Sequence, residues 1–367
     1  MVTKYAAFAI IAICVLSIAF IAVTYSISAK AVLLNSAGAS FPYPLIDRMI
    51  TEYNKEKPYT QVNYQPSGSG AGITALIDKT VVFAGSDAPL SASEREKAPN
   101  TLHIPVTIGS IAITYNIPDV PSGLKLTGQI MADIFEGKIT MWNDSAITNI
   151  NPTFTLPAAK ITTVHRSDSS GTTFVFTGYL SEVSSSWKNS VGQSKNVAWP
   201  AANDIASSGN TGVAQIVSST PNSIGYVELA YVLQTAMPVA AVQNPSGNYI
   251  LPSLEAAAIA AQAVALTGLP AGNADWANVN LLNANDPQAY PIVSFSYILV
   301  YKELNVIAGM TQERATELVY FLLYMVNDGQ NLAPSSNYAP LPDNVVAINI
   351  ETITLITFNE QTIATIL

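Results

Sequence analysis

Strand-like and helix-like segments alternate along the chain from residue 32 onward, and this alternation limits the choice of fold more than any other feature. The apolar residues of segment 42–55 recur at helical spacing, and a strand-like run follows at 61–65. Further along the chain, segment 161–165 reads as a strand and segment 172–183 as the helix that follows it. No repeat, charge block or low-complexity linker divides the residues after position 31. The pattern predicts an α/β architecture.

Local sequence signals indicate where several of these helices and strands lie. Ser40 is placed to cap the helix over 42–55, and Ser91 with Glu94 forms a capping-box motif. Segment 80–85 reads as a short strand, and segment 291–301 as a strongly apolar strand. Segment 104–117 has apolar runs on both sides of Gly109, so we expect it to cross between two parts of the fold.

The composition of the chain excludes a general nucleic-acid binder. Charged residues make up 11% of the 367 residues, and the formal net charge is −9. Only 16 residues are Lys or Arg, which cannot supply the basic face that a phosphate backbone requires. Only four arginines occur, so the setting of each one is informative. Hydrophobic residues make up 49% of the chain, which is ample for a large core.

The rare residues exclude several kinds of chemistry. Cys14 is the only cysteine, so no intrachain disulfide is possible, and the two histidines are too few for a zinc cluster. A GxxxxGK[ST] phosphate loop and a GxSxG nucleophile elbow are both missing from the sequence. We therefore expect no metal, no cofactor and no enzymatic activity.

The N-terminus reads as an export segment. After Lys4, residues 6–23 are apolar except for Ser17, and Ala29-Lys30-Ala31 fits a cleavage site. The apolar run is longer than an ordinary signal core and close to the length that spans a bilayer. Residues 1–31 are therefore either a signal peptide or an N-terminal membrane anchor, and both possibilities predict a protein that works outside the cytoplasm.

Three polar, glycine-containing loops stand directly before predicted helices. They are 37–42 (AGASFP), 66–72 (PSGSGAG) and 165–172 (HRSDSSGT). A helix N-terminus offers unpaired N–H groups and the positive end of the helix dipole, and glycine lets a ligand approach the backbone. The third loop also holds Arg166, one of the four arginines. Together the loops favour a binding site for a small oxyanion.

These loops and other segments resemble the phosphate-binding protein of the Pst-type ABC importer. The resemblance runs from about residue 35 to 346 and is carried by AGASFPYPL (37–45), NYQPSGSGAG (63–72), FAGSDAPLS (83–91), VHRSDSSGTTFVFTGYLS (164–181), SIGYVELAYV (223–232) and YAPLPDNVV (338–346). It implies a two-lobed periplasmic-binding-protein-like fold of type II, in which each lobe is a mixed sheet flanked by helices and the ligand cleft lies between the lobes. One lobe would contain residues 32–106 and 292–367, and the other residues 107–291.

The resemblance also implies a set of phosphate-binding residues. These are Ser40, Phe41, Ser69, Asp87, Arg166, Ser170, Gly171 and Thr172, with Asp168 as the acid that orients Arg166. Ser67 could replace Ser69, because the order of Gly and Ser in the second loop differs from the family pattern. Asp87 would accept the proton of phosphate, whereas sulfate has no such proton and would be rejected.

The implied function is high-affinity binding of phosphate and its delivery to ABC permease subunits, by a monomer that closes two lobes around the anion. Two alternatives stay open at this point. The ligand could be another oxyanion, namely arsenate, sulfate or molybdate, or the chain could be a surface or sensor protein that reuses the fold.

Overall fold

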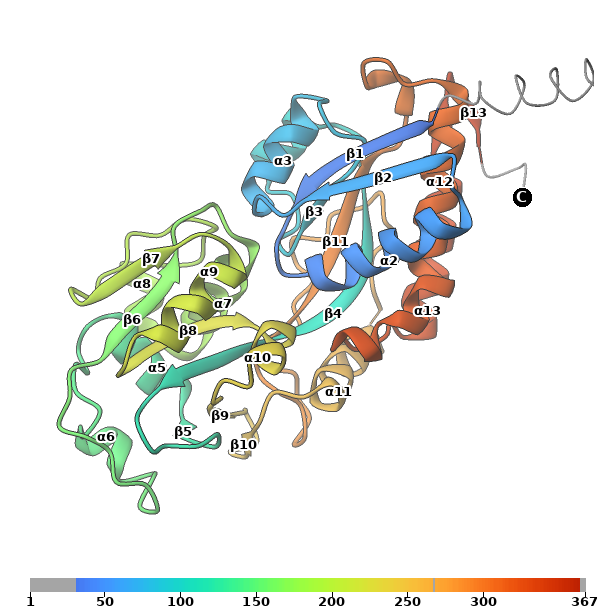
Figure 1. Ribbon diagram of the computed structural model, residues 1–367. Helices are drawn as coiled ribbons and strands as arrows, with labels where there is room; N and C mark the ends of the chain where they lie inside the picture. The colour runs from blue at the N-terminus through green and yellow to red at the C-terminus, as the bar shows by residue number, and fades with distance from the viewer. Residues whose placement is uncertain (1–30, 267, 364–367) are drawn as a thin grey trace, which may run out of the picture.

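The structure, a computed structural model, describes residues 31–266 and 268–363, and these residues form an α/β fold (Figure 1). Residues 1–30 of the predicted leader therefore lie outside the described residues. The main sheet has eight strands, in the order β2 (Thr60–Gln65), β1 (Val32–Gly38), β3 (Ala84–Ser86), β11 (Val293–Tyr301), β4 (Thr101–Asn116), β8 (Ser223–Glu228), β6 (Thr162–Arg166) and β7 (Asp204–Ser207).

The long strand β4 lies in the middle of this sheet and pairs with a different neighbour along each part of its length. Residues 101–110 pair antiparallel with β11, and residues 111–116 pair antiparallel with β8. We call β2, β1, β3 and β11 with their helices the first half, and β8, β6 and β7 with their helices the second half. Nearly every residue of β4 is buried, whereas β1 alternates between buried and more exposed positions. The apolar runs around Gly109 thus form one strand that crosses between the halves, as the sequence predicts.

Helices pack against both halves of the sheet. In the first half, α2 packs on β2, α3 on β1 and β3, and α12 on β1, while in the second half α9 packs on β8 and β6. The helices are α2 (Tyr43–Glu56), α3 (Ser69–Ile77), α4 (Ala92–Lys97), α5 (Gly128–Phe135), α6 (Ser145–Thr148), α7 (Gly171–Val183), α8 (Ser185–Ser190), α9 (Gly209–Ser219), α10 (Leu229–Thr235), α11 (Leu254–Ala265), α12 (Gln312–Val326) and α13 (Asp343–Thr354).

Smaller elements complete the fold. A second sheet has the order β10 (Tyr249–Ile250), β9 (Ala241–Gln243) and β5 (Lys125–Leu126), and a third pairs β12 (Thr357–Phe358) with β13 (Gln361–Thr362). Short 3₁₀ helices lie at Leu304–Val306, Asp328–Leu332 and Pro334–Ser336. Among the residues described, no helix combines the length and apolar character that crossing a bilayer requires.

Several sequence predictions of local structure are confirmed. The helix expected over 42–55 is α2, and its five periodic apolar residues are all buried. The capping box of Ser91 and Glu94 is present at α4. Two predictions are wrong. The strand expected over 80–85 is β3 at Ala84–Ser86, and Ser40 does not cap α2, because its hydroxyl accepts hydrogen bonds from Asn210 in the other half.

Candidate functional site

Parallel pairing in each half brings the polar loops to the same edge of the sheet. β1 runs parallel to β2 and β3, and β6 runs parallel to β7 and β8. The carboxyl ends of parallel strands meet at one edge, and that edge is where α/β folds bind ligands. The loops after β1 and β3 supply Ser40 and Asp87, and the first residue of α3, which follows β2, is Ser69. The end of β6 and the loops after β6 and β7 supply Arg166, the 168–172 segment and Asn210.

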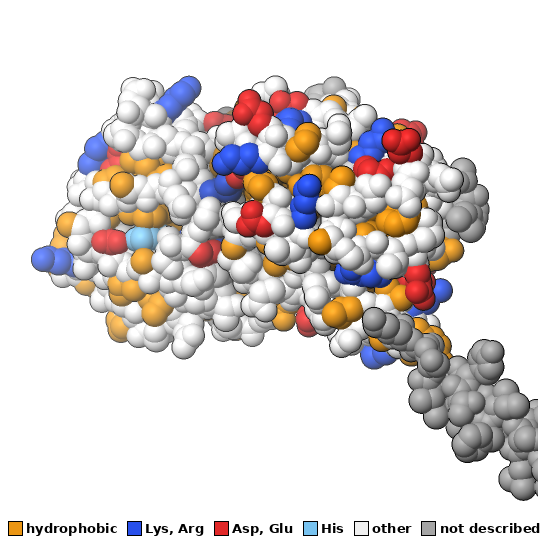
Figure 2. Space-filling view, turned by 90° about the horizontal axis from the view of Figure 1, so that it is seen from above, with side chains coloured by type: hydrophobic (Ala, Val, Ile, Leu, Met, Phe, Trp, Pro, Cys, Tyr) orange, Lys and Arg blue, Asp and Glu red, His pale blue; other side chains and the backbone are white. Residues whose placement is uncertain are grey.

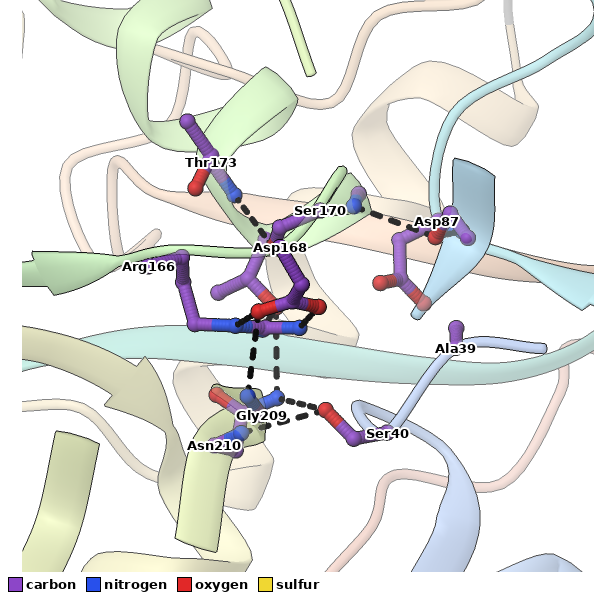
Figure 3. Close-up of polar contacts among 12 residues, drawn as sticks. Ala39, Ser40, Asp87, Arg166, Asp168, Ser170, Thr173, Gly209 and Asn210 are labelled. Carbon is purple, nitrogen blue, oxygen red and sulfur yellow. Dashed lines mark hydrogen bonds and ion pairs between the residues drawn. The ribbon is translucent and has the colours of Figure 1, made fainter. Parts of the chain in front are cut away.

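Arg166 is a buried cation held by side chains of its own loop. Its side chain is 1% exposed, and its Nε donates to Asp168 Oδ1 at 2.7 Å while Nη2 donates to Asp168 Oδ2 (Figure 3). Nη1 donates to Thr172 Oγ1 at 3.1 Å. The backbone N–H of Gly209 also donates to Asp168, at 3.1 Å. This two-point pairing fixes the plane of the guanidinium group.

The pKa of Asp168 responds to these contacts. Burial by itself would raise the pKa of this carboxyl group. The hydrogen bonds and positive charge of Arg166, together with the Gly209 N–H, outweigh burial and lower it below the ordinary value. Asp168 is therefore ionised at neutral pH and balances the charge of Arg166.

Asp87 is a second buried carboxyl group, but no cation pairs with it directly. It is 2% exposed, and its Oδ1 accepts a hydrogen bond from Ser296 Oγ at 2.6 Å. Burial raises the pKa of Asp87 to about 7, although the Ser296 hydroxyl, the charge of Arg166 and Ser69 act to lower it. Asp87 can therefore exchange a proton close to neutral pH.

Ser69 and Gly171 connect the two halves beside Asp87. The Gly171 N–H donates to Ser69 Oγ at 3.1 Å, and the Asp87 N–H donates to the same oxygen at 3.3 Å. A Cβ added at Gly171 would lie 2.3 Å from Ser69 Oγ and 2.6 Å from Asp87 Oδ2, so only glycine fits there. Asp87 Oδ2 thus faces the N-terminus of α7. Of the two candidates in the second loop, Ser69 makes these contacts; the buried Ser67 hydroxyl has no hydrogen-bond partner among the described residues.

Asn210 is the residue of this site that the sequence analysis missed. Its backbone N–H and its Nδ2 both donate to Ser40 Oγ at 3.1 Å, and Nδ2 also donates to Thr172 Oγ1 at 3.2 Å (Figure 3). The Glu228 N–H donates to Asn210 Oδ1 at 3.0 Å. A signal was available, because segment 207–210 (SSGN) is a fourth polar loop with a glycine before a predicted helix.

The remaining predicted residues lie around this group. Ser170 caps α7 by accepting from the Thr173 N–H at 3.1 Å. Phe41 is fully buried, and its carbonyl accepts from the Tyr338 hydroxyl at 2.6 Å. His165 lies outside the group. Its ring stacks on Trp199 with centroids 4.9 Å apart, and its Nε2 lies 2.7 Å from Asp204.

The two halves contact each other directly around the site. The Gly70 N–H donates to the Ser169 carbonyl at 2.9 Å, and the Tyr231 hydroxyl donates to the Ser40 carbonyl at 2.5 Å. An ion pair between Lys195 and Glu94 closes the rim at 2.5 Å. On the face shown in Figure 2, the side chains of Lys, Arg, Asp and Glu are scattered and do not gather into one large charged patch. Site residues of one half therefore lie within hydrogen-bond distance of the other half.

A cavity of about 680 Å³ lies beside Asp87, between α7 and the segment 277–282. Ser294 and Tyr297 of β11 also line it, whereas Arg166 and Asn210 do not. Asp87 is thus the member of the predicted phosphate-binding set that lines this cavity.

Comparisons with known proteins agree with this architecture. The family model for the PBP superfamily domain matches residues 25–327. The phosphate-binding protein PstS of Xylella fastidiosa (strain Temecula1) is 42% identical over 323 residues, which cover 86% of this chain and 84% of the relative. The phosphate-binding protein PstS of Pasteurella multocida (strain Pm70) is 38% identical over 330 residues, which cover 88% of this chain and 90% of the relative.

A solved structure extends the comparison to three dimensions. The phosphate-binding protein of Stenotrophomonas maltophilia superposes with a TM-score of 0.62 at 19% identity, and the match covers 87% of this chain and 94% of that one. The predicted periplasmic-binding-protein-like α/β fold is confirmed.

Proposed function

This chain belongs to the family of PstS phosphate-binding proteins within the PBP superfamily, as its motifs predict, and from that premise we propose that it binds inorganic phosphate for import by an ABC transporter. The activity in this proposal is binding, because the family consists of substrate-binding proteins. Phosphate would lie at the carboxyl ends of the parallel strands, among Ser40, Phe41, Ser69, Asp87, Arg166 and the 170–172 segment.

One observation carries the proposal: a buried arginine and a ring of neutral donors face a buried carboxyl group. Arg166 supplies a full positive charge, and the N-termini of α3, α7 and α9 supply N–H groups. The Ser69 and Ser40 hydroxyls accept hydrogen bonds from Gly171 and Asn210 of the other half, and the Thr172 hydroxyl accepts from Asn210 within its own half. An anion between the halves would satisfy the same donors and hold the halves together.

Asp87 gives the site a way to recognise a protonated anion. Phosphate near neutral pH keeps at least one P–OH group, which can donate a hydrogen bond to a carboxylate. Sulfate has only acceptor oxygens, so it could not form a hydrogen bond with an ionised Asp87. Burying these two acceptors against each other is unfavourable. The position of Asp87 Oδ2 beside the N-terminus of α7 supports this role.

The two halves would act as lobes that open and close. In the proposal, residues 32–106 and 292–367 form one lobe and residues 107–291 form the other. The change of β4 from pairing with β11 to pairing with β8, after Ser110, supports a hinge near this boundary. Closure around the anion would create the surface that a permease recognises. We place this activity outside the cytoplasm, where a monomer held by its leader, or released after cleavage, meets the permease subunits.

Calorimetric titration of the full-length chain tests the proposal, with bound ligand removed first by unfolding and refolding. Phosphate and then sulfate are titrated at pH 8, where Asp87 is ionised. Tight one-to-one binding of phosphate without binding of sulfate is the expected result. Equal binding of both ions would overturn the role of Asp87, and a folded sample that binds neither ion would overturn the proposed function.

A further inference from the structure

Ser296 contacts Asp87 from a strand that the sequence marks only as apolar. It lies in the middle of β11, is fully buried, and its Oγ donates to Asp87 Oδ1 at 2.6 Å. A hydroxyl group has one proton to donate, so this bond commits the Ser296 proton to Oδ1. The other carboxyl oxygen, Oδ2, lies toward Ser69 and Gly171.

An irregularity in the sheet occurs at this residue. Ser296 is opposite Thr107 of β4, but the next residue, Tyr297, is opposite Pro105, so Val106 is an extra residue on β4. The Gln330 side chain donates to the carbonyl of Val106 at 3.0 Å, which satisfies a group that the bulge removes from regular pairing. Bulges change the direction of nearby side chains and occur next to functional sites. The local backbone is thus adapted where Ser296 meets Asp87.

We propose that Ser296 is a positioning residue for anion discrimination, because its hydroxyl donates to Oδ1 of Asp87 and so favours the ionised carboxylate, whose Oδ2 lies beside Ser69 and the N-terminus of α7. The inference rests on the proposed function and names a residue outside the phosphate-binding set. A hydroxyl donor stabilises the ionised carboxylate. This carboxylate can accept a hydrogen bond from the P–OH group of phosphate, but it has no proton to donate to sulfate. Without this donor the buried carboxyl group holds its proton more strongly and can donate to either anion.

The surroundings of Asp87 make this donor important. Burial favours the neutral acid, and the Ser296 hydroxyl is the largest of the contributions that lower the pKa of Asp87, ahead of Arg166. The other ionisable groups that act on Asp87 are Arg166, Asp168, Glu228, Tyr64, Tyr231, Tyr297 and Tyr338. Burial raises the pKa of each of these tyrosines, so they stay neutral near pH 8 and do not replace the lost donor.

The test compares Ser296→Ala with Ser294→Ala in the full-length chain. Ser294 lies two residues away on β11, and its hydroxyl bonds to the carbonyls of Phe295 and Asp87 at 2.9 and 3.5 Å, not to the carboxyl group. Calorimetry measures the affinities for phosphate and sulfate from pH 5.5 to 9. For Ser296→Ala we expect the ratio of sulfate to phosphate affinity at pH 8 to rise at least about tenfold, the effect of one pKa unit. Ser294→Ala should match the unmodified chain.

Three results would overturn the inference. One is a Ser296→Ala profile that coincides with that of the unmodified chain. A second is an equal loss of both affinities, which indicates a structural role only. A third is the same change in Ser294→Ala. If the unmodified chain binds no phosphate, the proposed function fails instead, so the two failures are distinguishable. Circular dichroism and the unfolding midpoint of each variant establish that the sample is folded.

Discussion

The side-chain amide of Asn210 lies 3.1 Å from the hydroxyl oxygen of Ser40, and this hydrogen bond joins the first turn of α9 to the loop after β1. The same amide nitrogen also reaches Thr172, so one buried side chain connects three of the loops that form the site. Ser40 and Thr172 each become acceptors toward Asn210, which leaves their own O–H protons available to an anion.

Replacement of Asn210 by Ala should weaken phosphate binding by about tenfold to a hundredfold, because it leaves the buried Glu228 N–H without its acceptor and removes one of the two donors to each of the Ser40 and Thr172 hydroxyls. Isothermal calorimetry measures the change. Ser208→Ala is the matched control, since Ser208 is exposed and makes no side-chain cap bond at the start of α9. Equal affinity of Asn210→Ala and the control would contradict the prediction.

Arg166→Lys should abolish tight binding even though it keeps the positive charge. A lysine cannot bond to both oxygens of Asp168 and to Thr172 at once, so the buried acid would lose a partner. We expect a loss of at least about a hundredfold in phosphate affinity. Arg95→Lys provides the comparison, because Arg95 pairs with Asp275 away from the site. A similar loss in both variants would refute a specific role for Arg166.

The discrimination against sulfate should depend on pH in a defined direction. Burial raises the pKa of Asp87 to about 7, so its carboxyl group is increasingly protonated as the pH falls below 7. The protonated acid donates a hydrogen bond that sulfate can accept, and sulfate affinity should therefore rise from pH 8 to pH 5.5. In Asp87→Asn, sulfate should bind across this whole range with no such rise. A flat sulfate profile in the unmodified chain would count against the mechanism.

The same carboxyl group should make the ligand-free protein less stable at higher pH. Its folded pKa of about 7 exceeds the ordinary value of 3.8, so the folded state binds more protons between these values and the free energy of unfolding falls as the pH rises. At 1.36 kcal/mol per unit, this single group accounts for up to about 4 kcal/mol above pH 7. Glu228, whose burial raises its pKa well above 4.5, contributes in the same direction.

Urea unfolding of Asp87→Asn and of the unmodified chain, at pH 4.5 and pH 8, measures this effect. The variant should gain stability relative to the unmodified chain at pH 8 and much less at pH 4.5. Asp204→Asn serves as the control, because Asp204 is partly exposed and pairs with His165 away from the site. If the difference between Asp87→Asn and the unmodified chain is the same at both pH values, Asp87 is not the group responsible.

The ion pair of Lys195 and Glu94 should slow the release of phosphate. It connects the two halves at the rim, and the Lys195 carbonyl also accepts from the N–H of Ser170, the cap of α7. Lys195→Met should raise the dissociation rate a few-fold, in keeping with the roughly 1 kcal/mol of a partly exposed pair. Stopped-flow displacement measures this rate. Lys138→Met removes two ion pairs within one half and should leave the rate unchanged.

Residues close together in the sequence could be predicted from it. Helix α2 follows from the spacing of its apolar residues, and the cap of α4 follows from Ser91 and Glu94. Arg166 and Asp168 are two residues apart, so their pairing needs only the local turn that the loop provides. The loops before α2, α3 and α7 could be recognised because glycine, hydroxyl residues and a following helix form a local pattern.

Contacts between distant segments could not be predicted in this way. Ser296 reaches Asp87 across 209 positions of sequence, and its strand reads simply as apolar. Its place depends on the register of β11 against β4 and on the bulge at Val106, which no local pattern encodes. For Ser40, a local pattern led to a wrong prediction. Its sequence setting is that of a helix cap, but Asn210 from the other half uses its hydroxyl.

The pairing of Arg166 with Asp168 also determines how an anion approaches the molecule. The chain carries a net charge of −9, and the one arginine of the site is neutralised by its own partner. Beyond a Debye length the protein therefore repels a multivalent anion, and attraction begins only at the short range of aligned N–H dipoles. Added salt then speeds encounter by screening the repulsion and barely weakens the complex, the reverse of the behaviour of proteins that collect anions with a basic surface.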